Sequence, residues 1–531
     1  MGASREILAE AKTRGKLKSV NPATLESLGE VEIASAEQVR MAVDKARAAQ
    51  PAWGALPIKE RLKALKRAKH YVVDHLEELA QLITKENGKP IPESLSADLL
   101  PFLDMIDWLS KSAPKILKDE KISLPFQYTG RKSRLEHQPA GVVGVISPWN
   151  FPFNIPAGQI AMALAAGNAV ILKPSEYTPF IGRAVAKTFE EAGLPENVFQ
   201  IVSGDGETGG ALVKAAPHRL LFTGSVRTGQ RIMADAAENL TTLGLELGGK
   251  GAMVVCKDAH LENVTSAAVW GAFANAGQVC ASVERCYVHE SIADEFTRKV
   301  VEKTKRLRQG NGLEEGTDVG PMTTLEQFKN VEQQVAQARD KGAEILTGGK
   351  KNDSLPGWFW QPTVLRGVDH SFACMTAETF GPLLPIMTFK DENEVIGLAN
   401  DSHLGLTGSV WTKDLAKGQQ IASKVQAGTV MVNELLYTYA IPGTPWGGPK
   451  KSGIGRTHGE VGLLELTELH HVHTNTFPQM KDPWWFGYQK AHTEGFLAGS
   501  RAMHARTLGE RLKALLKLPG VLFKADKSKA L

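Results

Sequence analysis

Cysteine is scarce in this chain: its 531 residues include only four cysteines, and no two of them form a C-x-x-C pair. This scarcity excludes a dense disulfide framework and favours free thiols in a reducing compartment. No basic, apolar, small-residue signal opens the chain, so we expect a cytoplasmic protein. The net charge is only +4, which gives no argument for nucleic acid as a partner.

A long uninterrupted apolar segment is also missing. Residues 138–172 carry no charge, but prolines and side-chain amides interrupt them. A bilayer would leave those groups unsatisfied, so we expect a buried core with a functional loop inside it. The hydrophobic content of 42% and the charged content of 23% are ordinary for a soluble globular enzyme. A chain of this length should divide into two or three domains.

The positive charge is concentrated at the end of the chain. Residues 501–531 hold eight basic and two acidic residues, a net charge of +6, so the preceding residues sum to −2. In the same segment one apolar helical face is formed by Leu508, Leu512, Leu515 and Leu516. This pattern fits a peripheral contact with an anionic membrane. It fits equally a helix that packs over a substrate tunnel or onto a partner subunit.

Strand and helix patterns alternate from about residue 140. The apolar runs "GVVGVIS" and "NAVILKP" are typical of strands buried on both faces of a parallel sheet, and "AGQIAMALAAG" between them suits a helix. A second alternation runs from "GAMVVC" to about Gly448. The sequence therefore predicts a doubly wound α/β fold. Before residue 140 it predicts helices, one starting at a capping box at Ser35 and one running from about Lys59 to Asn87.

Several predicted strands end in motifs that could bind a ligand. "ILKPSE" carries Lys173 and Glu176, which could hold ribose hydroxyls or form a solvated loop pair. "FTGSVRTG" brings Gly224 and Ser225 to a helix N-terminus, where free N–H groups attract phosphate. "GDGETG" formally matches G-x-G-x-x-G, but the acid that should follow about 20 residues later is missing. We therefore interpret it as a glycine-rich turn.

Three side chains are candidates for catalysis. Glu246 ends an apolar strand in "LELGGK", where burial would raise its pKa and suit a general base, although a salt-bridged structural acid remains open. Asn150, in the proline-pinned "SPWNFP", could donate to an oxyanion or cap a turn. Cys280, in "FANAGQVCAS", could be a nucleophile or a small buried hydrophobe. A Cys–His hydrolase stays formally open.

A histidine group near the end of the predicted fold resembles a metal site. His470, His471 and His473 stand close together in the chain, and alternate residues of a strand share a face. We expect no carboxylate or cysteine to complete such a site. We therefore predict no metal.

Together these motifs resemble the aldehyde dehydrogenase superfamily from roughly residue 20 to residue 475. The stretches that carry the resemblance, all in the family's order, are "SPWNFP", "LKPSE", "FTGS", "LELGGK", "NAGQVC", "ETFGP" and "WGGPKKSGIGR". It implies a Rossmann-like cofactor domain, an α/β catalytic domain and a small β arm that pairs subunits. The implied boundaries are 1–117 and 138–248 for the cofactor domain, 118–137 and 449–479 for the arm and the segment that returns to it, 249–448 for the catalytic domain, and 480–531 for a C-terminal extension.

The resemblance also assigns roles to individual residues. Cys280 would be the nucleophile, Asn150 with the Cys280 backbone N–H would form the oxyanion hole, and Glu246 would be the general base. The implied cofactor-binding residues are Ser147, Trp149, Lys173, Glu176, Gly224, Ser225, Glu378 and Phe380. The implied cofactor is NAD, with NADP as the alternative, and an acid at Glu176 favours NAD because it would repel a 2′-phosphate.

The substrate region implied by the family is apolar in this chain. The loop of residues 433–444 contains Tyr437 and no Arg or Lys, and the helix "PFLDMIDWLSK" offers Met105 and Trp108 on one face. This predicts a medium- or long-chain aliphatic aldehyde, or another bulky apolar one. The alternatives are a semialdehyde dehydrogenase, a coenzyme-A-acylating aldehyde dehydrogenase and a non-catalytic structural relative. The implied assembly is a homodimer or tetramer.

Overall fold

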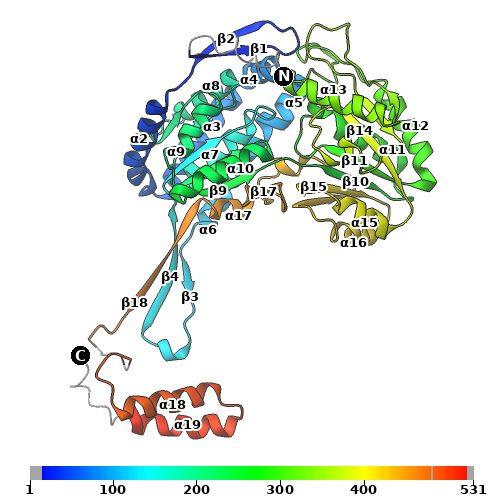
Figure 1. Ribbon diagram of the computed structural model, residues 1–531. Helices are drawn as coiled ribbons and strands as arrows, with labels where there is room; N and C mark the ends of the chain where they lie inside the picture. Colours follow the sequence, from blue (N-terminus) through cyan, green and yellow to red (C-terminus); the bar gives the residue numbers. More distant parts are fainter. Residues whose placement is uncertain (1–14, 480–481, 483, 523–531) are drawn as a thin grey trace. The chain divides into compact units, whose positions relative to one another are not determined.

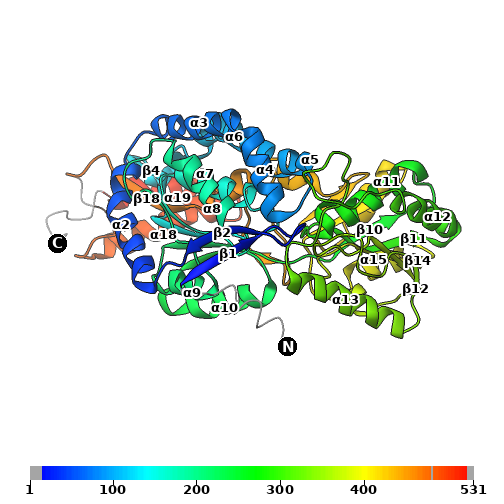
Figure 2. The same cartoon turned by 90° about the horizontal axis from the view of Figure 1, so that it is seen from above.

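The computed structural model describes residues 15–479, 482 and 484–522 (Figure 1, Figure 2). They form two compact units. The first holds the chain up to Lys118 together with His137–Leu469, and the second holds Asp119–Glu136 together with the chain from His470 onward. The chain therefore leaves the first unit twice to build the second.

A six-stranded sheet in the first unit has the strand order β17-β9-β8-β5-β6-β7. Every neighbouring pair is parallel except β17 with β9. The strands are β5 (Val142–Ile146), β6 (Ala169–Lys173), β7 (Phe199–Ile201), β8 (Arg219–Thr223), β9 (Thr242–Glu246) and β17 (Gly453–Ile454). From β5 the chain winds outward in one direction through β6 and in the other through β8. A ligand crevice is expected at the carboxyl end of β5, where the direction reverses.

Helices cover both faces of this sheet, as Figure 2 shows, because successive strand residues point to opposite sides. Val143 and Val145 of β5 pack on one face, and Val142 and Ile146 pack on the other. The first face is covered by α3 (Ile58–Asp74), α4 (Leu76–Asn87), α6 (Leu100–Ile116), α7 (Asn154–Ala166) and α8 (Pro179–Glu190). The second is covered by α2 (Ala36–Gly54), α9 (Gly206–Lys214) and α10 (Val226–Ala236).

A seven-stranded sheet in the same unit has the order β12-β13-β14-β11-β10-β15-β16 and is parallel except for β12. Its strands are β10 (Gly251–Val255), β11 (Val283–His289), β12 (Glu344–Thr347), β13 (Thr363–Arg366), β14 (Leu383–Phe389), β15 (Thr407–Trp411) and β16 (Thr429–Val432). Its helices are α11 (Leu261–Phe273), α12 (Ala293–Thr304), α13 (Leu325–Asp340), α14 (Ala373–Thr376), α15 (Glu392–Asn400) and α16 (Leu415–Ala422), and α17 (Gly459–Leu464) follows β17. The predicted α/β fold is confirmed.

The beginning of the described chain differs from its prediction in two places. A two-stranded hairpin, β1 (Lys16–Val20) and β2 (Ser27–Glu32), precedes the first helix, where only helices were expected. The single helix predicted from Lys59 to Asn87 is two helices, α3 and α4, divided at His75. The His75 ring stacks on Tyr71 at 4.2 Å, and its Nδ1 lies 2.8 Å from the Tyr71 carbonyl oxygen. The capping box at Ser35 is present as predicted.

The second unit begins with a three-stranded sheet in the order β18-β4-β3, formed by β3 (Glu120–Ile122), β4 (Arg131–Pro139) and β18 (Thr467–Asn475). Two helices follow, α18 (Lys490–His504) and α19 (Leu508–Leu522), and they pack against each other (Figure 1). The predicted leucine-faced helix is α19. Within the described part of the chain, the helices are all too short or too polar to cross a bilayer.

Candidate active site

Cys280 lies just after a tight turn that follows α11. Asn275 in this turn has φ 49°, a left-handed conformation that few residues other than glycine adopt. Gly277 has φ 74°, and a Cβ there would lie 2.2 Å from a carbonyl oxygen of the neighbouring loop. A Cβ on Gly249 would lie 2.1 Å from the carbonyl oxygen of Cys280. The glycines of the "NAGQVC" and "LELGGK" motifs therefore allow the backbone to pack closely around the thiol.

The surroundings of the Cys280 thiol favour its protonated form. Burial, with the nearby charges of Glu378 and Glu246, raises its pKa to about 12. Hydrogen bonds from the backbone N–H groups of Cys280 and Ala281 favour the thiolate and oppose the shift. Nucleophilic attack thus requires that the proton be removed as the thiolate forms.

Asn150 follows the carboxyl end of β5, at the predicted crevice, and is buried. Its Nδ2 donates to the carbonyl oxygen of Gln278 at 3.0 Å, which ties the side chain to the turn that carries Cys280. An amide nitrogen has two hydrogens, so the second remains available for a substrate oxygen. The structure therefore brings two of the predicted catalytic residues to one turn.

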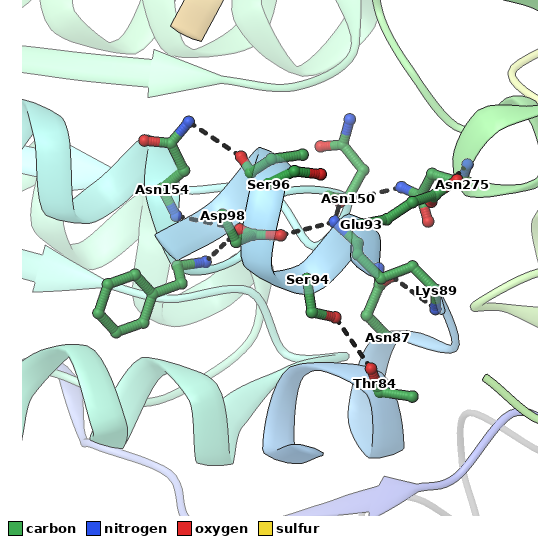
Figure 3. A network of polar contacts seen from close by, with 12 residues as sticks. Thr84, Asn87, Lys89, Glu93, Ser94, Ser96, Asp98, Asn150, Asn154 and Asn275 are labelled. Atoms are coloured by element: carbon green, nitrogen blue, oxygen red, sulfur yellow. Dashed lines mark hydrogen bonds and ion pairs between the residues drawn. The ribbon is translucent and has the colours of Figure 1, made fainter. Parts of the chain in front are cut away.

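A buried ion pair supports the backbone of Asn150 (Figure 3). Lys89 and Asp98 are both fully buried and pair at 2.6 Å, and the Lys89 ammonium also donates to the Asn150 carbonyl oxygen at 2.7 Å. The other Asp98 oxygen accepts from the backbone N–H groups of Phe153 and Asn154, at 3.1 and 3.0 Å. One carboxylate thus fixes both the lysine and the start of α7.

The residues that carry this network come from an irregular stretch between α4 and α6. Asp98 lies in a π-helical turn, η1 (Ser94–Leu99), of a kind often found at functional sites. Glu93, just before it, accepts from the backbone N–H of Asn275 at 2.9 Å. Asn275 in turn donates through Nδ2 to the Asn150 carbonyl oxygen at 3.0 Å. Burial raises the pKa of Glu93 to about 7, while Lys89 opposes the shift.

Sequence reasoning missed this network. Lys89 stands between Gly88 and Pro90 and reads as a loop residue, and Asp98 follows an ordinary polar stretch. The signal that could have indicated a role is the lysine beside a helix-ending glycine and a proline, two residues that fix the backbone. Its partner could not be identified, because the pairing depends on the turn at η1.

Glu246 ends β9 and is buried. Its Oε1 accepts from the hydroxyl of Thr457 at 3.5 Å, and its Oε2 has no partner within the described part of the chain. Burial raises the pKa of Glu246 well above its ordinary value, and the positive charge of Arg456 opposes the shift. A carboxyl group with one unoccupied oxygen and a raised pKa is suited to accept a proton from a water molecule.

Lys173 and Glu176 lie at the carboxyl end of β6, next to β5. Lys173 is buried, and its Nζ lies 3.5 Å from Glu176, which is one-third exposed. Ser147 lies on the adjoining strand end, and its buried hydroxyl has no partner among the described residues. These groups can supply the donors and the acceptor that ribose hydroxyls require.

The "FTGS" segment lies at the carboxyl end of β8 and leads into α10. The Ser225 side chain caps that helix by accepting from the backbone N–H of Thr228 at 3.3 Å. A Cβ on Gly224 would lie 2.6 Å from the Phe222 ring, so the position requires glycine. The helix N-terminus, at the same end of the sheet as Lys173, is suited to a pyrophosphate.

Glu378, Phe380 and Trp149 meet on the catalytic side. Glu378 accepts from the backbone N–H of Gly249 at 2.9 Å, and burial raises its pKa to about 8. The Phe380 ring lies edge-on to Trp149 at 5.5 Å. Glu284 and Lys250, which sequence reasoning missed, hold the loop that carries Glu378 and Phe380. Glu284 accepts from the backbone N–H of Phe380 at 2.8 Å and pairs with buried Lys250 at 2.6 Å. A cofactor that bridges the two sheets fits these groups and the unpartnered Ser147 hydroxyl.

The predicted substrate residues lie on two segments. Met105 and Trp108 belong to α6, where Met105 is part of the core and Trp108 is half-buried. Tyr437 begins the short helical turn η6 (Tyr437–Ala440) and is half exposed. A Cβ on Gly443, in the loop after η6, would lie 3.2 Å from the Trp108 indole nitrogen, so the two segments adjoin.

Tyr439 of the substrate loop contacts two rings to which the sequence assigned no substrate role, those of His458 and Trp446. The Tyr439 ring lies 4.4 Å from the His458 ring and 5.2 Å from that of Trp446. Burial, with the charges of Glu246 and Cys280, raises the pKa of Tyr439. The hydroxyl of Thr457, the residue before His458, lies 3.5 Å from Glu246, so these rings adjoin that carboxyl group. Burial lowers the pKa of His458 to about 4, so its ring is neutral at physiological pH.

The three histidines considered as metal ligands lie on β18. His473 bonds the Ser133 hydroxyl at 2.6 Å through Nδ1, and the ring centres of His471 and His473 are 6.0 Å apart. His470 Nδ1 lies 3.2 Å from Glu136, so the expectation of no carboxylate beside these histidines was wrong for His470. In the ranges that the structure describes, groups of three or more His, Cys, Asp or Glu suited to a metal are absent.

Residues 8–472 match the profile of the aldehyde dehydrogenase family. The chain is 39% identical over 481 residues to a 4,4'-diapolycopene aldehyde oxidase of Methylomonas sp, which covers 90% of each chain. It is 37% identical over 445 residues to a putative NADP(+) succinate-semialdehyde dehydrogenase of Mycobacterium ulcerans, covering 84% of this chain and 86% of the relative. The solved structure of Staphylococcus aureus betaine aldehyde dehydrogenase with NAD+ is similar, with a TM-score of 0.85 and 34% identity, covering 89% of this chain and 94% of that one.

Proposed function

The chain belongs to the aldehyde dehydrogenase family and is an NAD(P)-dependent enzyme of it, and we propose that it oxidises a medium- or long-chain apolar aldehyde to the carboxylic acid. The observation that carries the substrate proposal is the neutral, largely aromatic wall beside the catalytic groups. The Tyr439 and His458 rings are in contact there, tilted by 59° to each other, and Trp108 adjoins the same loop.

The rings of Tyr439, His458 and Trp108 offer a terminal carboxylate no positive charge. The loop of residues 433–444 contains no Arg or Lys, and the His458 ring is neutral at physiological pH. A dicarboxylic semialdehyde would bring a charged end into this region, and an unpaired charge in a desolvated site is unfavourable. An alkyl or terpenoid chain would instead gain contact with the ring faces.

The proposed catalytic roles follow from the chemistry of Cys280, which is partly buried, and of Asn150 and Glu246, which are buried. The Cys280 thiol releases its proton to solvent water as its sulfur attacks the carbonyl carbon, and Asn150 Nδ2 donates to the oxygen that becomes negative. A nicotinamide cofactor, when bound, would supply the oxidising power by accepting the hydride that leaves this carbon, so that a thioester remains on Cys280. Glu246 then takes a proton from the water that hydrolyses the thioester on Cys280, which releases the acid and restores the thiol.

We assign the cofactor contacts by position around the crevice. Lys173 and Glu176 would hold one ribose and Glu378 the other. The remaining contacts would come from Ser147, Trp149, Gly224, Ser225 and Phe380. The Glu176 carboxylate favours NAD over NADP, because it would accept from a 2′-hydroxyl and repel a 2′-phosphate.

Relatives support both the substrate proposal and its main alternative. The Methylomonas relative is named for a large apolar aldehyde, and the Mycobacterium relative for a succinate semialdehyde. Coenzyme-A acylation is less favoured because Glu246 is present to activate water. A non-catalytic role is less favoured because Cys280, Asn150 and Glu246 are all present.

The experiment that tests the proposal is a panel of aldehydes assayed with NAD and with NADP. It would include acetaldehyde, hexanal, hexadecanal, a terpenoid aldehyde, succinic semialdehyde and betaine aldehyde. We expect kcat/KM to rise with the apolar chain and to be higher with NAD. A higher kcat/KM for succinic semialdehyde than for hexanal would refute the substrate proposal, and acid formation without coenzyme A would exclude the acylating alternative.

The assembly and the location are part of the same proposal. The three-stranded sheet of the second unit would pair subunits into a homodimer or tetramer. The cytoplasmic enzyme would also contact membranes peripherally through the chain that follows this sheet, where apolar aldehydes partition.

A further inference from the structure

The α18–α19 hairpin has small residues between its helices and large apolar residues outside. Gly495 and Ala498 of α18 and Ala514 of α19 are buried in the hairpin. Phe496 and Leu497, which lie between the two buried residues of α18, are about half exposed. A hairpin stabilised only by its own core would bury the larger side chains, because they remove more apolar surface from water.

The exposed apolar residues of α19 form one continuous face. Leu508, Leu512, Leu515 and Leu516 are 73, 52, 54 and 82% exposed. At 3.6 residues per turn they fall on one side of the helix, and Ala514 falls on another, toward α18. We call these four residues the leucine face. A contiguous apolar face of this kind marks a surface that another apolar phase covers.

Basic side chains flank the leucine face. Arg511 lies on one side of it, where its Nε donates to the Ala505 carbonyl oxygen at 2.7 Å, and exposed Lys513 and Lys517 lie toward the other. Glu510 is the single acidic residue in the sequence of α19. An apolar face bordered by cations is complementary to anionic lipid, whose headgroups lie directly above an acyl layer.

An aromatic segment leads into the hairpin. Trp484, Trp485, Phe486 and Tyr488 are each between 41 and 70% exposed. The Arg131 guanidinium of β4 lies over the Trp484 ring at 5.1 Å, and Arg131 also pairs with Asp482. These contacts attach the start of the segment to the three-stranded sheet. Tryptophan and tyrosine are favoured at the boundary between lipid and water, where an apolar ring and a polar edge are both satisfied.

We propose that the α18–α19 hairpin binds an anionic membrane surface, with the leucine face in the headgroup–acyl boundary and the flanking cations against lipid phosphates. The hairpin would lie in the interface, because its helices are too short or too polar to span a bilayer. The proposed function includes a peripheral membrane contact through the C-terminal tail, and this inference rests on that part of it. The inference adds that the membrane surface is anionic and that the hairpin binds it. It depends on no catalytic assignment.

The test is co-sedimentation of the full chain with phosphatidylcholine vesicles, with and without phosphatidylserine, at low and high salt. The key variant is Leu512→Gln/Leu516→Gln, since glutamine keeps helix propensity and removes two members of the leucine face. Leu415→Gln is the matched control, because Leu415 is a 60% exposed leucine at the start of α16 in the other unit. Lys513→Gln/Lys517→Gln tests the charge contribution, and circular dichroism checks that each variant is folded.

We expect binding only to the anionic vesicles, weakened by salt. Loss of each leucine should weaken it about tenfold and loss of each lysine about fivefold, whereas Leu415→Gln should bind like the unaltered chain. Failure of the full chain to bind anionic vesicles at low salt would overturn the proposal. Unchanged vesicle binding by the double leucine variant would also overturn it. A change in the subunit number of that variant without vesicles would overturn it as well, because it would show that a second copy of the chain covers the leucine face. Hexanal oxidation by the unaltered chain without vesicles tests the catalytic proposal separately.

Discussion

The turn that leads to Cys280 and the terminal hairpin both reverse the usual placement of side chains: charged groups are buried at the first, and apolar groups are exposed at the second. Behind the turn, Lys89 and Asp98 are charged and fully buried. In the hairpin, Leu512 and Leu516 are apolar and at least half exposed. The buried charges are matched to each other and to backbone groups, whereas the described chain offers nothing that covers the leucines. Buried charges that find partners inside the protein hold a site in place. Exposed apolar side chains that nothing in the described chain covers indicate a partner outside it.

The largest effect should come from removing the proposed nucleophile, Cys280. Cys280→Ala should lower aldehyde oxidation by about a thousandfold or more, because no other group can form the covalent bond. Cofactor binding, followed by NADH fluorescence, should persist. The matched control is Cys256→Ala, since Cys256 is a buried core residue and its loss should leave turnover largely intact. Substantial activity in Cys280→Ala would refute the proposed mechanism.

Loss of the proposed base should affect a later step of the same reaction. Glu246→Gln should release NADH in a single burst and then turn over about a hundredfold more slowly, because the amide cannot accept a proton from water. Rapid-mixing absorbance measurements would separate the burst from steady-state turnover. A steady-state rate equal to that of the unaltered enzyme would show that another group activates the water.

Breaking the buried ion pair should unfold the first unit more readily. Lys89→Met should lower the free energy of unfolding by about 3–5 kcal/mol, because Asp98 would remain buried without its counter-charge. The double variant Lys89→Met/Asp98→Leu should lose less stability than Lys89→Met. Its kcat should still be lower than that of the unaltered enzyme, because the Asn150 carbonyl oxygen still lacks its donor. Urea denaturation and turnover together test this.

The control for the ion pair is Lys63→Met, which removes one partner of the exposed Lys63–Glu60 pair at 2.8 Å. It should change the free energy of unfolding by no more than about 1 kcal/mol. If both lysine variants lose stability equally, the buried network has no special role.

The pKa of Glu93 predicts a smaller, pH-dependent effect. Burial raises this pKa from 4.5 to about 7, so the folded state binds the proton more tightly than the unfolded state. The resulting stabilisation is present below about pH 4.5 and is lost as the pH rises to about 7. Glu93→Gln cannot titrate, so its unfolding free energy should fall less over this range. Urea denaturation across the range would test this, and equal slopes for the two proteins would contradict the assignment.

The smallest effect should be found in the hairpin. Leu516→Ala should change the free energy of unfolding by no more than about 0.5 kcal/mol, because the side chain is 82% exposed. The same change at fully buried Leu65 in α3 should cost about 2–5 kcal/mol. A large loss of stability in Leu516→Ala would show that the leucine face packs within the protein, and thermal denaturation without lipid would detect it.

The sequence alone identified much of the fold, where the signal is local. The apolar runs of β5 and β6, the capping box at Ser35 and the glycine after α4 each depend on neighbours in the chain. The order of short motifs was sufficient to indicate the family and to place Cys280, Asn150 and Glu246 as candidate catalytic residues. The leucine face was equally visible, because helical spacing is a property of the sequence.

Only the tertiary structure decided which distant groups meet. Lys89 donates to a carbonyl oxygen 61 positions away, and the Tyr439 ring contacts that of His458 although the "WGGPKK" segment separates them in the chain. The inward position of Ala514 depends on the packing of α18 against α19. The physical reason is the range of the interactions. Helix caps and buried strands follow from residues a few positions apart, whereas a buried charge is tolerated only where folding supplies its partner.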